Sequence, residues 1–144
     1  MKAFDTNTVE VKLYGNRASM RKAIRKIGYN CDHTESMVIP VTVYSFKDGR
    51  ATKSPVSSEM YIHRGISMPV LVHESLHAAT VALRRKKESV DLGRKIQYRE
   101  ELLAYTQTAI LQDILKHFFP KTNSAYDFKN IKWWARNSVK DSRK

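Results

Sequence analysis

The chain has 144 residues, which suits one ordinary domain with room for one hydrophobic core, and we expect residues 1–144 to fold as a unit. Apolar residues make up 42% and aromatic residues 10% of the sequence, a composition that excludes a disordered tail. The formal net charge is +12, so the surface is strongly basic.

No stretch is long and apolar enough for a transmembrane helix, and the N-terminus carries no apolar signal region. The single Cys31 has no partner for an intramolecular disulfide, which favours the reducing cytoplasm. The basic residues are spread over positions 17–26, 84–87 and the stretch from 116 onward. A solvated basic surface is the simpler interpretation, and contact with a polyanion is the alternative.

The N-terminal third alternates between two kinds of periodicity. Residues 8–14 alternate apolar and polar side chains and predict a strand. Residues 17–27 place apolar side chains at helical spacing between Arg and Lys, and Gly28 supplies a helix stop. We therefore expect an amphipathic helix with a basic outer face, followed by a polar loop over residues 31–36.

The middle of the chain is rich in strand-forming residues. Residues 37–47 are mostly β-branched or aromatic and end at Asp48-Gly49, a strong hairpin signal. The return over residues 50–58 contains Pro55, so a strand there is short or lies at an edge. Residues 59–63 predict a further strand, which leads directly into the next helix.

That helix carries the most informative motif of the chain. Residues 68–83 are predominantly apolar, with Ser67 as a candidate N-cap, and they include His73, Glu74 and His77 in the spacing H-E-x-x-H. Residues four apart lie on one helix face, so the two imidazoles can bind one zinc ion. Glu74 lies about 100° around the helix from His73, where it suits a general base.

The apolar residues surround most of this helix, and we expect it to be buried on nearly all sides. Two histidines and a glutamate would be costly there without partners or a metal. The structural alternative is that both histidines are hydrogen-bonded core residues and that Glu74 pairs with an arginine.

A catalytic zinc usually has three protein ligands, so one remains to be found. Metzincins continue the motif with Gly and His, but this chain has Thr80 and Leu83 at those positions, which excludes that class. His117 lies at the far end of the next predicted helix, where the helix dipole favours a basic residue.

The best candidate lies on the helix predicted from about residue 94 to 119. Glu101 follows His77 by 24 positions, enough for one helix to end and an antiparallel helix to return. The small Ala104 would allow close approach of the two helices. Glu101 is therefore the predicted third ligand, and Asp91 is the second candidate for that ligand. The alternative role of Glu101 is that of an exposed carboxylate paired with Lys or Arg. Of Glu100 and Glu101, we expect Glu100 to be the more exposed.

The C-terminal segment predicts a basic amphipathic helix over residues 124–140. Trp133 and Trp134 lie beside Lys129, Lys132 and Arg136, a combination that can bind nucleic acid weakly. Anchoring of the helix in the core by one tryptophan is the simpler interpretation.

The run His73-Glu-Ser-Leu-His77 followed by Glu101-Leu-Leu-Ala-Tyr105 resembles the small gluzincins of bacteria and phages, the compact zinc metallopeptidases related to the ImmA/IrrE type. The resemblance covers residues 61–112. It implies a single zincin-like α+β domain. The resemblance further implies that a small three- to four-stranded sheet packs on the active-site helix and an antiparallel glutamate-bearing helix, with further helices at both ends and an edge strand along the cleft. It also implies Zn²⁺ on His73, His77 and Glu101, with Glu74 as base.

Amide hydrolysis of a protein or peptide by a zinc-activated water is the predicted reaction. Tyr105 and His63 are candidate oxyanion donors, although each also suits a structural role. The strand at residues 59–63 is a candidate for backbone contact with an extended peptide, which would add as a further strand at an edge of the sheet. The alternative function is a nucleic-acid-associated protein whose zincin site is vestigial or regulatory, or a protease that acts on DNA-bound proteins.

Overall fold

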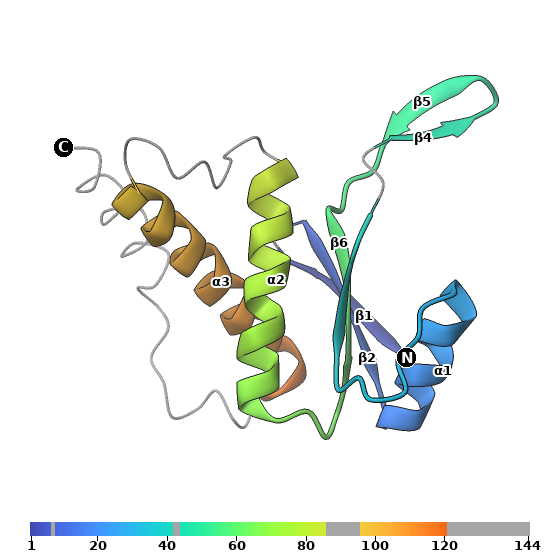
Figure 1. The fold of residues 1–144 in the computed structure, drawn as a ribbon, viewed down its shortest axis with the longest axis vertical. Coiled ribbons are helices and arrows are strands. Elements are labelled where there is room, and N and C mark those ends of the chain that lie inside the picture. The colour runs from blue at the N-terminus through green and yellow to red at the C-terminus, as the bar shows by residue number, and fades with distance from the viewer. Residues whose placement is uncertain (7, 42–43, 86–95, 121–144) are drawn as a thin grey trace.

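The computed structural model describes residues 1–6, 8–41, 44–85 and 96–120 (Figure 1). In chain order the elements are β1 (Lys2–Thr6), β2 (Val9–Tyr14), α1 (Arg17–Ile27), β3 (Met37–Pro40), β4 (Tyr44–Lys47), β5 (Arg50–Lys53), β6 (Ser58–His63), α2 (Met68–Arg85) and α3 (Ile96–Phe118). The predicted α+β class is confirmed. The C-terminal helix expected at residues 124–140, with Lys129, Lys132 and Arg136, lies outside the described residues.

The main sheet has four strands in the order β1-β2-β6-β3. β2 and β6 run parallel, whereas β1 and β3 pair antiparallel with their neighbours. β1 was not predicted, because only Thr6 at its end is fully buried and its residues show no clear alternation. β1 is a strand because it pairs with β2. Thr8, in the turn between them, has a positive φ of 66°.

β6 is the central strand of this sheet, and the prediction that residues 59–63 lie at an edge was wrong. Met60 and Ile62 pack in one hydrophobic cluster, and Tyr61 packs in the other on the opposite face. Five of its six residues are buried, as expected for a strand covered on both faces. The edge next to α2 is β3 instead.

The strand-forming stretch at residues 37–47 contains two strands, and only the second of them belongs to the predicted hairpin. β3 ends at Pro40, and β4 pairs only with β5 in a separate two-stranded sheet. The predicted Asp48-Gly49 hairpin turn is confirmed, since both residues have positive φ, 54° and 75°. In Figure 1 this hairpin projects away from the main sheet.

α1 covers one face of the sheet. Its start is capped by the Asn16 side chain, which accepts a hydrogen bond of 2.8 Å from the Ser19 N–H, and its end by Gly28 with φ 106°. The buried Met20 and Ile24 pack with Tyr61 and with neighbouring residues of the loop and β3. Helix, stop and following loop thus agree with the sequence prediction.

α2 and α3 cover the other face, and α3 crosses α2 in roughly the opposite direction (Figure 1). The shared core contains Leu71 and Ala78 from α2 and Ile110 and Ile114 from α3. None of the helices in the described part of the chain is both long and apolar enough to cross a membrane.

The core contact of α3 yields a stability prediction. Ile110→Ala should lower the free energy of unfolding by about 2–5 kcal/mol, because this fully buried side chain leaves a cavity when truncated. Ile27→Ala is the matched control, since Ile27 is 50% exposed on α1 and its truncation should change stability by less than about 0.5 kcal/mol. Chemical denaturation measures both, and equal losses would contradict the described packing.

Candidate metal centre

α2 is buried along one side, where it packs against the sheet and against α3. Leu71, Ser75 and Ala78 are buried, and the Ser75 hydroxyl is satisfied by donating to the Leu71 carbonyl at 2.7 Å. His73 and His77 lie on the opposite side and are exposed. The expectation of a helix buried on nearly all sides was therefore wrong. The motif lies on an open face that a ligand can reach.

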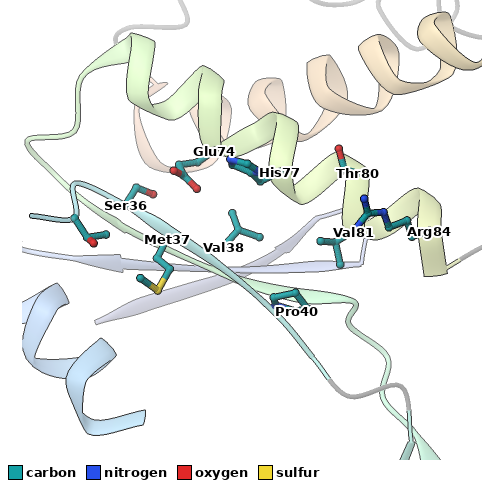
Figure 2. Close-up of a pocket in the computed structure, with 10 residues that line it drawn as sticks. Ser36, Met37, Val38, Pro40, Glu74, His77, Thr80, Val81 and Arg84 are labelled. Carbon is teal, nitrogen blue, oxygen red and sulfur yellow. The ribbon is translucent and has the colours of Figure 1, made fainter. Parts of the chain in front are cut away.

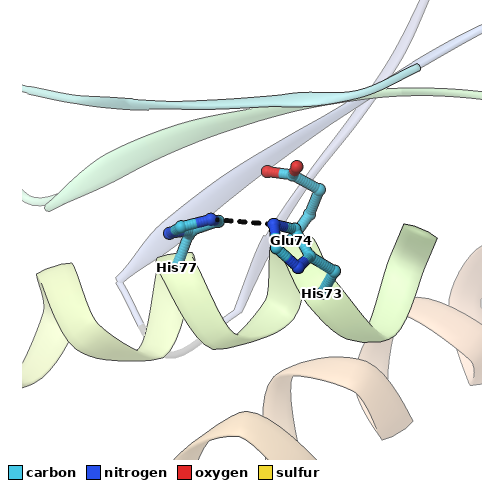
Figure 3. Close-up of side chains that lie close together, drawn as sticks. All are labelled: His73, Glu74 and His77. Atoms are coloured by element: carbon cyan, nitrogen blue, oxygen red, sulfur yellow. Dashed lines mark hydrogen bonds between the residues drawn. The ribbon is translucent and has the colours of Figure 1, made fainter. Parts of the chain in front are cut away.

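The two histidines converge as ligands of one metal would. Their Nε2 atoms are joined by a hydrogen bond of 3.1 Å, and the rings meet edge to face with centroids at 4.8 Å (Figure 3). Two imidazole nitrogens on one tetrahedral zinc, each at about 2.0–2.1 Å, are separated by about 3.3 Å. The donor pair fits zinc in both chemistry and spacing.

Glu74 completes the cluster from the side facing the sheet. One potential ligand atom from each of His73, Glu74 and His77 lies within 4.8 Å of the others. Burial raises the pKa of the half-buried Glu74 carboxyl, and the neighbouring His77 and His73 partly oppose this rise. A carboxylate with a raised pKa is a better proton acceptor near neutral pH.

A hollow of about 380 Å³ lies between α2 and the edge strand β3 (Figure 2). It is lined by Thr34, Ser36, Met37, Val38 and Pro40 on one side and by Glu74, His77, Thr80, Val81 and Arg84 on the other. A second hollow adjoins it and is lined by Glu35, Ser36, Pro69, Val70, His73 and Glu74. Because Ser36 and Glu74 belong to both, we call the two together the β3 cleft.

The predicted third ligand, Glu101, is not a member of the His73, Glu74 and His77 group. It lies half-buried on α3, whereas Glu100 is exposed, as was expected of the two. The Gln107 side chain donates to the Val72 carbonyl at 2.9 Å and ties α3 to the start of α2. The link between the helices, with Asp91, lies outside the described residues. Glu101 as a ligand stays a prediction.

The two candidate oxyanion donors lie away from the cleft lining. His63 is only 3% exposed at the end of β6, with its Nε2 3.6 Å from Glu35, so it reaches the cleft only through that carboxylate. Tyr105 is half-buried on α3. Neither lines the hollows beside Glu74, and a direct role in the reaction stays a prediction for both.

Two features of the cleft were missed in the sequence. Pro40 marks an edge strand, because proline cannot donate a ladder hydrogen bond, and it signalled that residues 37–40 are the exposed edge. Arg84 follows His77 by seven residues, two helical turns on the same face. Both features can be inferred from the sequence once residues 68–83 are recognised as the helix that carries the motif.

Comparisons with protein-family models, with curated proteins and with solved structures gave no match to this chain. The chemistry of the site therefore has to follow from its donor set, from the burial of Glu74 and from the cleft beside it.

Proposed function

We propose that this protein is a zinc-dependent peptidase in which His73 and His77 hold the metal and Glu74 is the general base. The observation that carries the proposal is the pair of Nε2 atoms 3.1 Å apart, with the Glu74 carboxylate beside them in a cleft. Zinc held there would supply a positive charge that acidifies water and polarises a carbonyl group.

Glu74 has the position and the basicity for two proton transfers. It accepts a proton from the attacking water, whose oxygen forms a bond to the carbonyl carbon of the substrate. It then returns the proton to the amide nitrogen as the carbon–nitrogen bond breaks, so that an acid and an amine leave. Its partial burial supports this role, because burial favours the protonated form that occurs between the two steps.

The edge strand β3 is suited to hold the substrate backbone. Its inner edge pairs with β6, and among the described residues no strand pairs with its outer edge. An extended peptide can add there as a further strand and place one amide bond beside Glu74. In this proposal β3, and not the strand at residues 59–63, contacts the backbone of an extended peptide.

Glu101 remains the proposed third ligand, and a substitution tests it directly. We expect Glu101→Gln to weaken zinc binding by at least about tenfold, because a neutral amide is a poorer ligand than a carboxylate. Glu100→Gln on the exposed side of α3 is the matched control. Competition with a chromophoric chelator measures both affinities. Equal zinc affinity in the two variants would remove Glu101 from the ligand set.

The proposal as a whole is tested on protein purified without chelators and without a histidine tag. We expect about one zinc per chain, and cleavage of a denatured protein substrate that stops on chelation and returns when zinc is added. A wild-type protein that contains no metal and takes up no zinc in a titration would refute the proposed function.

A further inference from the structure

The two ends of the β3 cleft differ in charge. Glu35 lines the end near His73, and its carboxylate is already paired with Arg17 at 2.8 Å and with Arg21 at 3.8 Å. Arg84 lines the opposite end and is exposed. No carboxylate among the described residues forms an ion pair with Arg84. The carboxylate at one end is therefore already paired with arginines of this chain, while Arg84 at the other end presents a positive charge to a ligand.

The guanidinium of Arg84 lies over the cleft rather than away from it. Figure 2 shows it reaching back along α2 toward Thr80, above the strand that carries Val38 and Pro40. Side chains on a helix lean toward its N-terminus, which is the direction of the zinc ligands. Apart from Glu74, the hollow that Arg84 lines contains no acidic residue.

The rise per residue of a helix and of a strand shows which residue of a bound peptide lies opposite Arg84. Arg84 lies seven residues beyond His77 on α2, which is about 10.5 Å along the helix axis. Because the Arg84 side chain reaches back toward Thr80, which is about 4.5 Å beyond His77 along the axis, its guanidinium lies between these two distances. An extended peptide advances about 3.3 Å per residue, so the guanidinium faces a substrate residue about one to three positions from the zinc site.

The direction follows from the course of β3. This strand begins at Met37, directly after Ser36 beside Glu74, and ends at Pro40 toward the Arg84 end of the hollow (Figure 2). A peptide that pairs antiparallel with β3 therefore has its N-terminal residues at the Arg84 end. On this basis, and resting on the proposed function, we propose that the cleft selects substrates with Asp or Glu within about three residues on the N-terminal side of the cleaved bond, bound by Arg84.

The sequence of the hairpin that follows β3 is also predominantly basic. The chain passes from Pro40 into β4 and β5, a ten-residue stretch from Tyr44 to Lys53 with three basic residues and a single acidic residue, Asp48. Phe46 on β4 is 81% exposed, so the hairpin also offers apolar surface.

Binding can be measured without turnover. The probes are fluorescent pools of extended peptides that differ only in carrying Glu, Gln or Lys at one fixed position, and the protein is zinc-loaded Glu74→Gln. We expect the Glu pool to bind about tenfold more tightly than the Lys pool at low salt, with the difference shrinking as salt increases. Adding Arg84→Glu should reverse the order of the Glu and Lys pools, and adding Arg84→Gln should abolish the difference.

Lys22→Glu is the matched control, because it makes the same change in net charge on an exposed site of α1, and it should leave the preference intact. Equal binding of all pools, or a Glu preference unaffected by either Arg84 substitution, would overturn the proposal. Mapping of the bonds that the wild type cleaves gives the second readout, and acidic residues enriched only on the C-terminal side would overturn the assigned direction.

These failures are separable from failure of the proposed function. A zinc-loaded protein that cleaves peptides without regard to acidic residues refutes the Arg84 subsite and leaves the peptidase. If a Glu preference in peptide binding depends on Arg84 but the zinc-loaded protein cleaves no peptide, the Arg84 subsite is supported and the proposed peptidase function is refuted.

Discussion

Glu74→Gln is expected to lower kcat/KM for peptide hydrolysis by a factor of about 10² to 10⁴ while zinc stays bound. The substitution keeps the shape of the side chain but removes its capacity to accept and return a proton. His73 and His77, which supply the converging nitrogens, are unchanged. The measurement is the initial rate on a cleaved peptide, with zinc content determined on the same preparation.

Folding should survive this substitution. Because burial raises the pKa of Glu74, its ionised form is less favourable in the folded than in the unfolded metal-free protein. The contribution of Glu74 to stability is therefore greatest at low pH and is lost as the pH rises through its folded pKa. Near neutral pH, metal-free Glu74→Gln should be as stable as the wild type or slightly more stable.

Glu100→Gln on the exposed side of α3 controls for the loss of one carboxylate and should retain full activity. If Glu74→Gln with full zinc content cleaved at the wild-type rate, Glu74 would not be the base, and the observed cleavage would come from a contaminant or from another group.

His73→Ala and His77→Ala are each expected to abolish stoichiometric zinc binding. Each removes one of the two nitrogens that lie 3.1 Å apart, and the exposed position of both side chains leaves no buried group behind. Zinc added to the wild type should raise its Tm, because a ligand that binds only the folded state stabilises it by mass action. In the two variants the Tm should not respond to zinc.

The matched control is His117→Ala. His117 is exposed in the last turn of α3 and stacks on Phe4 at 4.0 Å, in a different part of the fold from the metal site. This variant should bind zinc as the wild type does. Zinc uptake that persists in His73→Ala and His77→Ala but fails in His117→Ala would place the metal elsewhere in the chain.

The local features of this protein follow from short stretches of sequence. The Asp48-Gly49 turn and the Gly28 cap were predicted because positive φ is accessible to Gly and tolerated by Asp, and neither depends on a distant partner. The convergence of His73 and His77 was predicted for the same reason, since the four-residue spacing brings them together on any helix.

Pairing between distant strands decided the features that were missed. Residues 59–63 were recognised as a strand, but whether β6 is central or at an edge depends on β2 and β3, which lie far away in the sequence. β1 is a strand because it pairs with β2. β3 and β4 are separate strands because β3 pairs with β6 and β4 pairs with β5. No local pattern contains this information.

The sequence by itself therefore determined the chemistry of the site: two imidazoles on one helix face, with a carboxylate about 100° around from the first. Only the tertiary structure decided what surrounds it. α2 buries the face with Leu71 and Ala78 and leaves the histidines open, and the choice of β3 as the edge strand puts a cleft beside Glu74 with Arg84 at its end. The physical reason is that helix geometry is set by neighbours in the chain, whereas burial and strand order are set by contacts between residues far apart in it.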